Sequence, residues 1–228
     1  MKWSFILALL FLSMKASAED VLPIYVFEIR PVIYQDDNKK IKGEWLDGFE
    51  KLSKDSGIKF HYQFVSIPRM EIFLTGKNPG CNLTLLKTQA RKKMNIQFIY
   101  DHPVKTIFKV YQRGDDIRRW SLKDLSYNKK VKIITNTSVA IDILKEKNIE
   151  AELLFNLNSI VHMLLIKRVD IVVGSNLAIE KMPEFNDKKV IAVQEVKTLS
   201  HGIGCSHATP KYILDKLQKS AKKLHLVF

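Results

Sequence analysis

The stretch from residue 66 to residue 100 constrains the fold most, because it predicts a helix, a strand and a second helix in close succession. The strand, Cys81–Leu86, ends in a polar turn. Thr88 in that turn is the expected N-cap of the second helix, since a threonine hydroxyl accepts a hydrogen bond from a free N–H group there. Open α/β sheets bind ligands where strand ends meet helix N-termini. Arg91, in the first turn of this helix, is a candidate to bind an anion there. Its position alone fits a solvated arginine beside Lys92 and Lys93 better.

The rest of the chain alternates between strand-like and helix-like segments, which predicts a parallel sheet with helices on its faces. The predicted strands cover residues 21–27, 59–64, 131–134, 152–155, 170–173 and 190–193, with long extended runs at 104–111 and 195–205. Gly57 is expected to end one helix in a left-handed cap. Asn158 is the expected N-cap of a helix over 159–167, and Thr209 that of an amphipathic terminal helix with Pro210 at its first position.

The N-terminus has the form of a secretory signal peptide. Met1 and Lys2 form a short basic region, residues 3–14 are apolar, and Ala16-Ser17-Ala18 is a cleavage site. The apolar run is too short to span a bilayer, which needs about 20 residues. We expect a mature, soluble chain that starts at Glu19, is periplasmic or secreted, and has no membrane anchor.

The formal charge is +13, and it falls to +11 when Lys2 and Lys15 leave with the signal peptide. A strongly basic chain raises the question of nucleic-acid binding. The lysines, however, are spread over nearly every segment, and the sequence has no nucleic-acid-binding motif. We therefore expect a solvated basic surface and no nucleic-acid partner.

The two cysteines, Cys81 and Cys205, fit either a disulfide in an oxidising compartment or two buried thiols. Cys205 also lies between His201 and His207, but two histidines and one cysteine on an extended chain are weak evidence for a metal site. No Ser-His-Asp order, zinc pattern or phosphate-binding loop is visible. We expect no catalytic residue, no metal and no cofactor.

Three short motifs together resemble a known family. They are Gly80-Cys81-Asn82, the run Thr88-Gln89-Ala90-Arg91-Lys92-Lys93, and Phe98-Ile99-Tyr100 followed by Pro103. They are similar to the bacterial extracellular solute-binding proteins of family 3, which are periplasmic binding proteins for amino acids and related solutes. The resemblance implies a two-lobed α/β fold of type II topology with two crossing strands. Lobe one would comprise residues 19–107 and 200–228, and lobe two residues 108–199. Both cysteines would then lie in lobe one, which favours the disulfide.

The resemblance also implies the ligand contacts. Arg91 matches the arginine that holds an α-carboxylate, and Arg69 lies in a segment similar to a Pro-Trp-Xaa-Arg motif. Glu28 fits a cleft residue and a solvated loop acid equally well. Amino-acid binders usually carry a carboxylate just after the strand that matches residues 171–173, where this chain has Gly174-Ser175-Asn176, so an organic acid or a peptidoglycan fragment fits as well as an amino acid. The predicted ligand-binding residues are Phe27, Glu28, Arg69, Thr88, Arg91, Thr135, Ser138 and Ser175.

The function implied is reversible binding of a small anionic or amino-acid-like solute between two lobes, for uptake by an ABC transporter. The chain would act as a monomer with a membrane permease or a sensor as partner. The main alternative is a ligand-sensing or orphan envelope protein without a transporter. A dehydratase-like enzyme, which would depend on Glu28 as its acid, is the third possibility.

Overall fold

The computed structural model of the protein describes residues 20–154 and 156–226, so the predicted signal peptide lies outside the described residues. The strands are β1 (Val21–Val26), β2 (Tyr34–Gln35), β3 (Ile41–Lys42), β4 (Lys59–Phe64), β5 (Cys81–Leu86), β6 (Gln97–Arg113), β7 (Ile133–Thr135), β8 (Glu152–Leu153), β9 (Ile171–Ser175) and β10 (Val190–Cys205). The helices are α2 (Leu46–Ser56), α3 (Ile67–Thr75), α4 (Gln89–Lys93), α5 (Leu122–Tyr127), α6 (Ser138–Lys145), α7 (Leu157–Leu165), α8 (Asn176–Ile179), α9 (Pro183–Asn186) and α10 (Lys211–Lys223).

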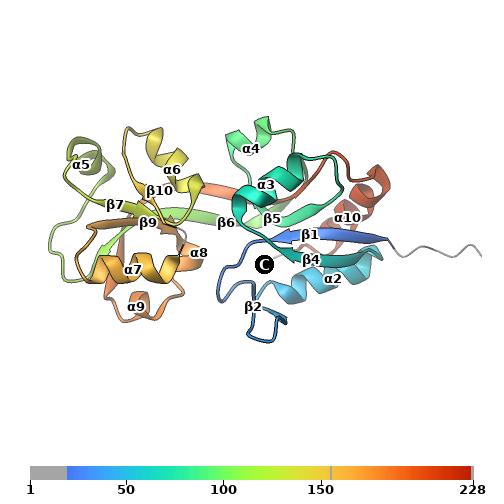
Figure 1. Ribbon diagram of the computed structural model, residues 1–228, viewed down its shortest axis with the longest axis horizontal. Helices are drawn as coiled ribbons and strands as arrows, with labels where there is room; N and C mark the ends of the chain where they lie inside the picture. The colour runs from blue at the N-terminus through green and yellow to red at the C-terminus, as the bar shows by residue number, and fades with distance from the viewer. Residues whose placement is uncertain (1–19, 155, 227–228) are drawn as a thin grey trace, which may run out of the picture.

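Two lobes lie side by side along the long axis of the molecule, and the long strands β6 and β10 connect them (Figure 1). One eight-stranded sheet runs through both lobes in the order β4-β1-β5-β10-β6-β9-β7-β8. β10 pairs antiparallel with both β5 and β6, whereas β1 with β4 and β7 with β9 pair in parallel. The predicted two-lobed α/β fold with two crossing strands is therefore confirmed.

The core of lobe one lies between β1 and the helices α2 and α10. Leu22 and Ile24 of β1, Leu52 of α2 and Leu217 of α10 are all fully buried in one hydrophobic cluster. Burying such side chains contributes about 1.5–3 kcal/mol each. α2 ends as predicted at Gly57, which has a left-handed φ of 67°, a conformation that glycine adopts without steric cost.

Lobe two has one hydrophobic cluster on each face of its sheet. Ile171 and Val173 pack with residues of α6, whereas Val172, between them on β9, packs with residues of α7. Successive side chains of a strand point to opposite faces. The alternation along β9 therefore places α6 and α7 on opposite faces of the sheet.

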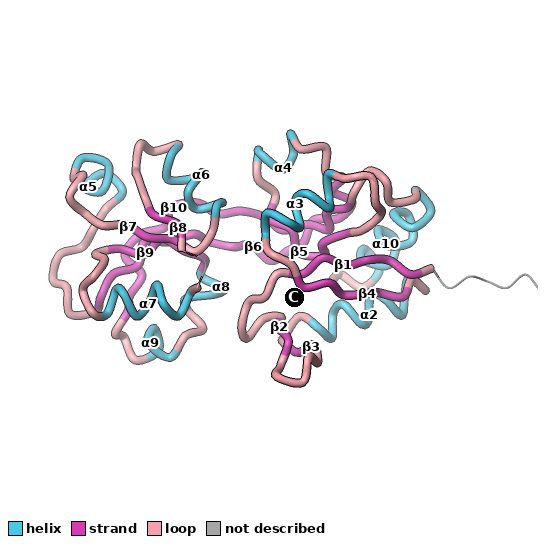
Figure 2. Tube along the Cα trace, viewed as in Figure 1, coloured by secondary structure: helices cyan, strands magenta, loops and turns pink. Residues whose placement is uncertain are grey.

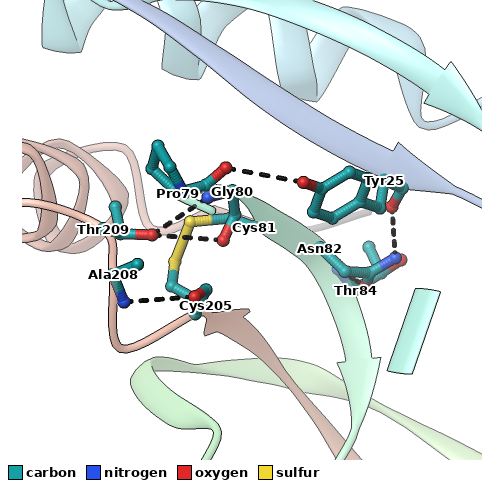
Figure 3. The surroundings of a disulfide bond; sticks show 10 residues. Tyr25, Pro79, Gly80, Cys81, Asn82, Thr84, Cys205, Ala208 and Thr209 are labelled. Carbon is teal, nitrogen blue, oxygen red and sulfur yellow. Dashed lines mark hydrogen bonds between the residues drawn. A yellow bond between two sulfur atoms is a disulfide. The ribbon is translucent and has the colours of Figure 1, made fainter. Parts of the chain in front are cut away.

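Cys81 and Cys205 form a disulfide that joins the start of β5 to the end of β10 (Figure 3). Both cysteines are fully buried, and they are direct partners in the antiparallel pairing of the two strands. Next to them, the Thr209 hydroxyl accepts a hydrogen bond from the Gly80 N–H at 3.1 Å and donates one to the Gly80 carbonyl at 3.2 Å. The disulfide thus ties the second crossing strand to β5 of lobe one.

Several element boundaries differ from the prediction. β6 is longer than expected, and β10 joins the predicted strand 190–193 to the predicted run 195–205. β6 continues through Pro103 because the pairing shifts register there, between Ser200 and Gly202 of β10; proline is tolerated at such irregularities. Asn156, not Asn158, caps α7 by accepting a hydrogen bond from Ser159 N at 2.9 Å. The predicted lobe boundaries at residues 107 and 200 fall inside the two crossing strands, and they stay a prediction.

The start of the terminal helix also differs from the prediction. α10 begins at Lys211 with Pro210 as its N-cap, because the Thr209 hydroxyl that was expected to cap it is bonded to Gly80 instead. The difference is one residue. Its cause is a contact with a segment distant in sequence.

Candidate functional site

A cleft of about 450 Å³ lies between the lobes, with α4 on the side of lobe one, α6 on the side of lobe two and β10 between them. Figure 2 shows α4 and α6 facing each other on the same side of the crossing strands. This volume falls in the range of small-molecule sites. The lining residues are Lys87, Thr88, Gln89, Ala90, Val139, Asp142, Ile143, Lys145, Glu146, Lys197 and Leu199.

Thr88 is the predicted ligand-binding residue that the structure places in this cleft. Its hydroxyl accepts a hydrogen bond from Arg91 N at 3.1 Å and so begins α4, which confirms Thr88 as the N-cap. Leu86 at the end of β5 fixes where this turn starts, because Thr88 N donates to the Leu86 carbonyl at 3.2 Å. The strand and the cap together hold the Thr88 side chain on the cleft wall.

The Arg91 side chain is turned into lobe one, where only 4% of it is exposed. Its Nε donates to Glu71 Oε1 of α3 at 2.9 Å, and its Nη1 donates to the Leu86 carbonyl at 3.1 Å. Burial lowers the pKa of Arg91, and the charge of Glu71 acts against that lowering. The Arg91 guanidinium is therefore paired with the Glu71 carboxylate of its own lobe. Contact between Arg91 and a ligand stays a prediction.

Replacing Arg91 by methionine is expected to lower the free energy of unfolding by about 2 kcal/mol, because the Glu71 carboxylate and the Leu86 carbonyl both lose their donor. Urea denaturation would measure the change. Lys92→Met on the same short helix is the matched control, since Lys92 is exposed and should change stability by less than about 0.5 kcal/mol. An Arg91→Met protein as stable as the control would mean that the ion pair does not stabilise lobe one.

The three predicted hydroxyl residues of lobe two lie at or next to the starts of helices. Thr135 is fully buried, and its hydroxyl accepts from Thr137 N at 3.4 Å. Thr137 caps α6, whose first residue is the half-buried Ser138. Ser175 caps α8 by accepting from Leu177 N at 3.2 Å. The hydroxyl groups of residues 135–138 could either contact a ligand or cap the helix, and the structure shows capping at Thr137.

The other three predicted residues lie around the loops and helix of lobe one. Phe27 is half-buried against a small cluster that contains Tyr25. Glu28 is exposed and forms an ion pair with Arg30 at 2.8 Å. Arg69 is exposed, with its guanidinium 5.4 Å from the centre of the Phe73 ring. None of these three residues lines the described cleft.

The wall formed by α6 was missed in the sequence. Val139, Asp142, Ile143 and Glu146 line the cleft together. Their spacing of three and four residues places them on one face of a helix. The sequence carries this spacing, but a face with two apolar and two acidic positions does not by itself indicate a cleft wall, because the opposite wall comes from α4.

The lobes also touch through α8. The Asn176 side-chain oxygen accepts a hydrogen bond from Ile107 N of β6 at 2.9 Å. Leu177 packs against the core of lobe one, and Lys181 forms an ion pair with Glu44 of lobe one. The segment after β9, where amino-acid binders usually carry a carboxylate, thus holds the lobes together in this structure.

Comparison with solved structures shows the same architecture. A truncated arginine-binding protein, ArgBP from T. maritima, in its arginine-bound form, matches with a TM-score of 0.73 at 16% identity, over 90% of this chain and 96% of that chain. A histidine kinase sensor domain with similarity to periplasmic binding proteins matches with a TM-score of 0.74 at 14% identity, over 91% and 90% of the two chains. The chain has the fold of a periplasmic binding protein.

A third structure with this periplasmic binding-protein fold is ArtJ, the arginine-, lysine-, histidine-binding protein of Geobacillus stearothermophilus. It matches with a TM-score of 0.71 at 16% identity, over 90% of each chain. No protein-family model and no curated protein matches the sequence. The resemblance drawn from the short motifs is confirmed at the level of the fold.

Cys205 cannot serve as a thiolate ligand in a metal site with His201 and His207, because it is bonded to Cys81. His201 is buried, its Nδ1 donates to the Thr84 carbonyl at 2.8 Å, and its Nε2 contacts the Thr106 hydroxyl. Among residues 20–154 and 156–226, no helix is long and apolar enough to cross a bilayer.

Proposed function

We propose that this protein is an exported binding protein that reversibly holds a small anionic or amino-acid-like solute between its lobes. The observation that carries the proposal is the cleft of about 450 Å³, whose walls come from α4 of lobe one and α6 of lobe two. Closing two lobes around β6 and β10 would bury such a solute on both sides, which is how hinged domains commonly enclose ligands.

Polar groups on both walls support recognition of a polar solute. Lobe one offers the Thr88 hydroxyl and the Gln89 amide, and lobe two offers Asp142 and Lys145. Binding sites of this kind combine an apolar lining with a few polar groups that orient the ligand. The predicted contacts Phe27, Glu28, Arg69, Ser138 and Ser175 lie outside this lining and are proposed to reach the solute only when the lobes close. For the buried Arg91 and Thr135, ligand contact is proposed to require that they also leave their present hydrogen bonds.

Uptake through a membrane permease from the periplasm is the role we propose first. Ligand sensing is the second candidate, favoured by the similarity to a histidine kinase sensor domain over 91% of this chain. We propose binding rather than catalysis, since the acid on which a dehydratase would depend, Glu28, is exposed and paired with Arg30. Pull-down of a permease or of a kinase from envelope membranes would separate uptake from sensing.

A cleft-filling substitution tests solute binding directly. A thermal-shift screen of the mature protein should include amino acids, organic acids and peptidoglycan fragments. A ligand at about 100 times its Kd should add about 2.7 kcal/mol of stability. Ala90→Trp, which places a large side chain in the cleft, should abolish the shift.

Lys92→Trp is the matched control, because it puts the same side chain on the outer surface of α4. It should leave the shift unchanged. A compound that stabilises the wild type and both variants equally would place the binding site elsewhere on the protein.

A further inference from the structure

The charged residues that line the cleft differ in whether they have an ion-pair partner. Lys87 forms an ion pair with Asp101, and Lys197 forms one with Glu146 at 2.6 Å. These two lysines and Glu146 are therefore already neutralised by neighbours. Among the described residues, the lining charges without an ion-pair partner are Asp142 and Lys145, both on α6.

Asp142 is the carboxylate that faces the other lobe. It is exposed, and no described residue forms a hydrogen bond or an ion pair with its side chain. Its charge still acts on Arg91 across the cleft, where it opposes the lowering of the Arg91 pKa that burial causes. Arg91 cannot serve as its partner in this arrangement, because Arg91 is bonded to Glu71 at 2.9 Å.

Closing the cleft, as proposed above, would bring Asp142 into partly apolar surroundings. Val139 and Ile143 lie beside it on the same wall, and Leu199 lines the space between the lobes. A carboxylate that loses water without gaining a cation is strongly disfavoured. A solute that carries only negative charge would leave Asp142 unpaired and would add repulsion, which selects against that class of ligand.

We propose that Asp142 receives a cationic group of the solute, an ammonium or a guanidinium, and that Lys145 attracts its carboxylate. This inference rests on the proposed function, and it narrows the solute from anionic or amino-acid-like to amino-acid-like. The specificity for the cation then comes from α6, because Ser175 and Asn176 after β9 are engaged in capping α8 and in the contact with Ile107.

Isothermal titration calorimetry can test the role of Asp142. The probes are the common L-amino acids, with agmatine as a cation that lacks a carboxylate, and succinate and glutarate as carboxylates that lack a cation. The proteins are the wild type, Asp142→Asn, Asp142→Lys and Glu150→Gln. Glu150 is also an exposed acid of lobe two, but it lies outside the cleft lining, so it controls for the change in net charge.

We expect at least one amino acid to bind the wild type more tightly than either dicarboxylate does. Asp142→Asn should weaken binding of that amino acid at least roughly tenfold, since it removes the ion pair that the closed cleft would bury. Asp142→Lys should abolish its binding and favour glutarate, and Glu150→Gln should leave its Kd unchanged. Far-UV circular dichroism should show all four proteins equally folded.

The contrary results separate the two proposals. Amino acids that bind the wild type and Asp142→Asn with equal Kd would overturn the role of Asp142 and leave solute binding intact. Dicarboxylates that bind the wild type more tightly than any amino acid would do the same. Failure of every probe, together with the absence of any thermal shift in the wider screen, would overturn the proposed function itself.

Discussion

Replacing Cys81 and Cys205 together by alanine should lower the free energy of unfolding by about 4 kcal/mol. The disulfide closes a loop with a sequence separation of 124 residues, and removing so long a closed loop returns a large conformational entropy to the unfolded chain. Alanine is preferred to serine because both positions are fully buried, where an unpaired hydroxyl would add its own penalty. Urea denaturation of the oxidised wild type and of the double variant would measure the difference.

A reducing agent provides the control for this measurement. Dithiothreitol should destabilise the wild type by a similar amount and leave the double alanine variant unchanged. A double variant that unfolds at the same urea concentration as the oxidised wild type would contradict the prediction. It would mean that the contacts around Gly80 and Thr209, together with the strand pairing, hold β10 to β5 without the disulfide.

Local chemistry made several elements of this fold predictable. The strands 59–64 and 81–86 have the predicted boundaries in the structure. Gly57 ends α2 and Thr88 begins α4 as expected, because each depends on one residue and its immediate neighbours. Alternating strands and helices were sufficient to predict parallel pairing within each lobe.

The features that depend on distant partners were not predictable in this way. Thr209 has a side chain that could cap α10, but its hydroxyl is hydrogen-bonded to the backbone of Gly80, 129 residues earlier. Arg91 has the position of an anion-binding residue, but Glu71 on the preceding helix occupies its Nε. Asp142 is a candidate ligand-binding residue only because α4 and α6 together form a cleft around it. A single sequence shows which groups a residue carries, but not which groups from elsewhere in the chain will meet them.

The buried histidine of the second crossing strand should make stability depend on pH. Burial lowers the pKa of His201 to about 4, while the hydrogen bond to Thr84 acts in the opposite direction and the charges of His102 and Arg91 lower it further. An unfolded histidine has a pKa of about 6.5. The unfolded chain therefore binds a proton at this residue more readily than the folded chain does, and stability falls as the pH drops from about 6.5 towards 4.

The size of this effect follows from the difference between the two pKa values. At about 1.4 kcal/mol per pKa unit, His201 should contribute a loss of roughly 3 kcal/mol across that range. The pKa of His102 is also lowered, mainly by burial, so His102 adds a loss in the same direction. The aspartates with lowered pKa values, such as Asp20 and Asp55, add their losses below pH 4 instead, because their unshifted value is 3.8.

Urea denaturation at a series of pH values between 4 and 7 would measure the contribution of His201. His201→Asn keeps a side-chain N–H that can donate to the Thr84 carbonyl, but it does not titrate in this range, so the fall in stability should be smaller by roughly 3 kcal/mol. His61→Asn on the exposed side of β4 is the matched control and should keep the slope of the wild type. If the free energy of unfolding of His201→Asn and of the wild type falls in parallel with pH, protonation of His201 does not cause the loss of stability in acid. The buried His102 would then be the next residue to replace.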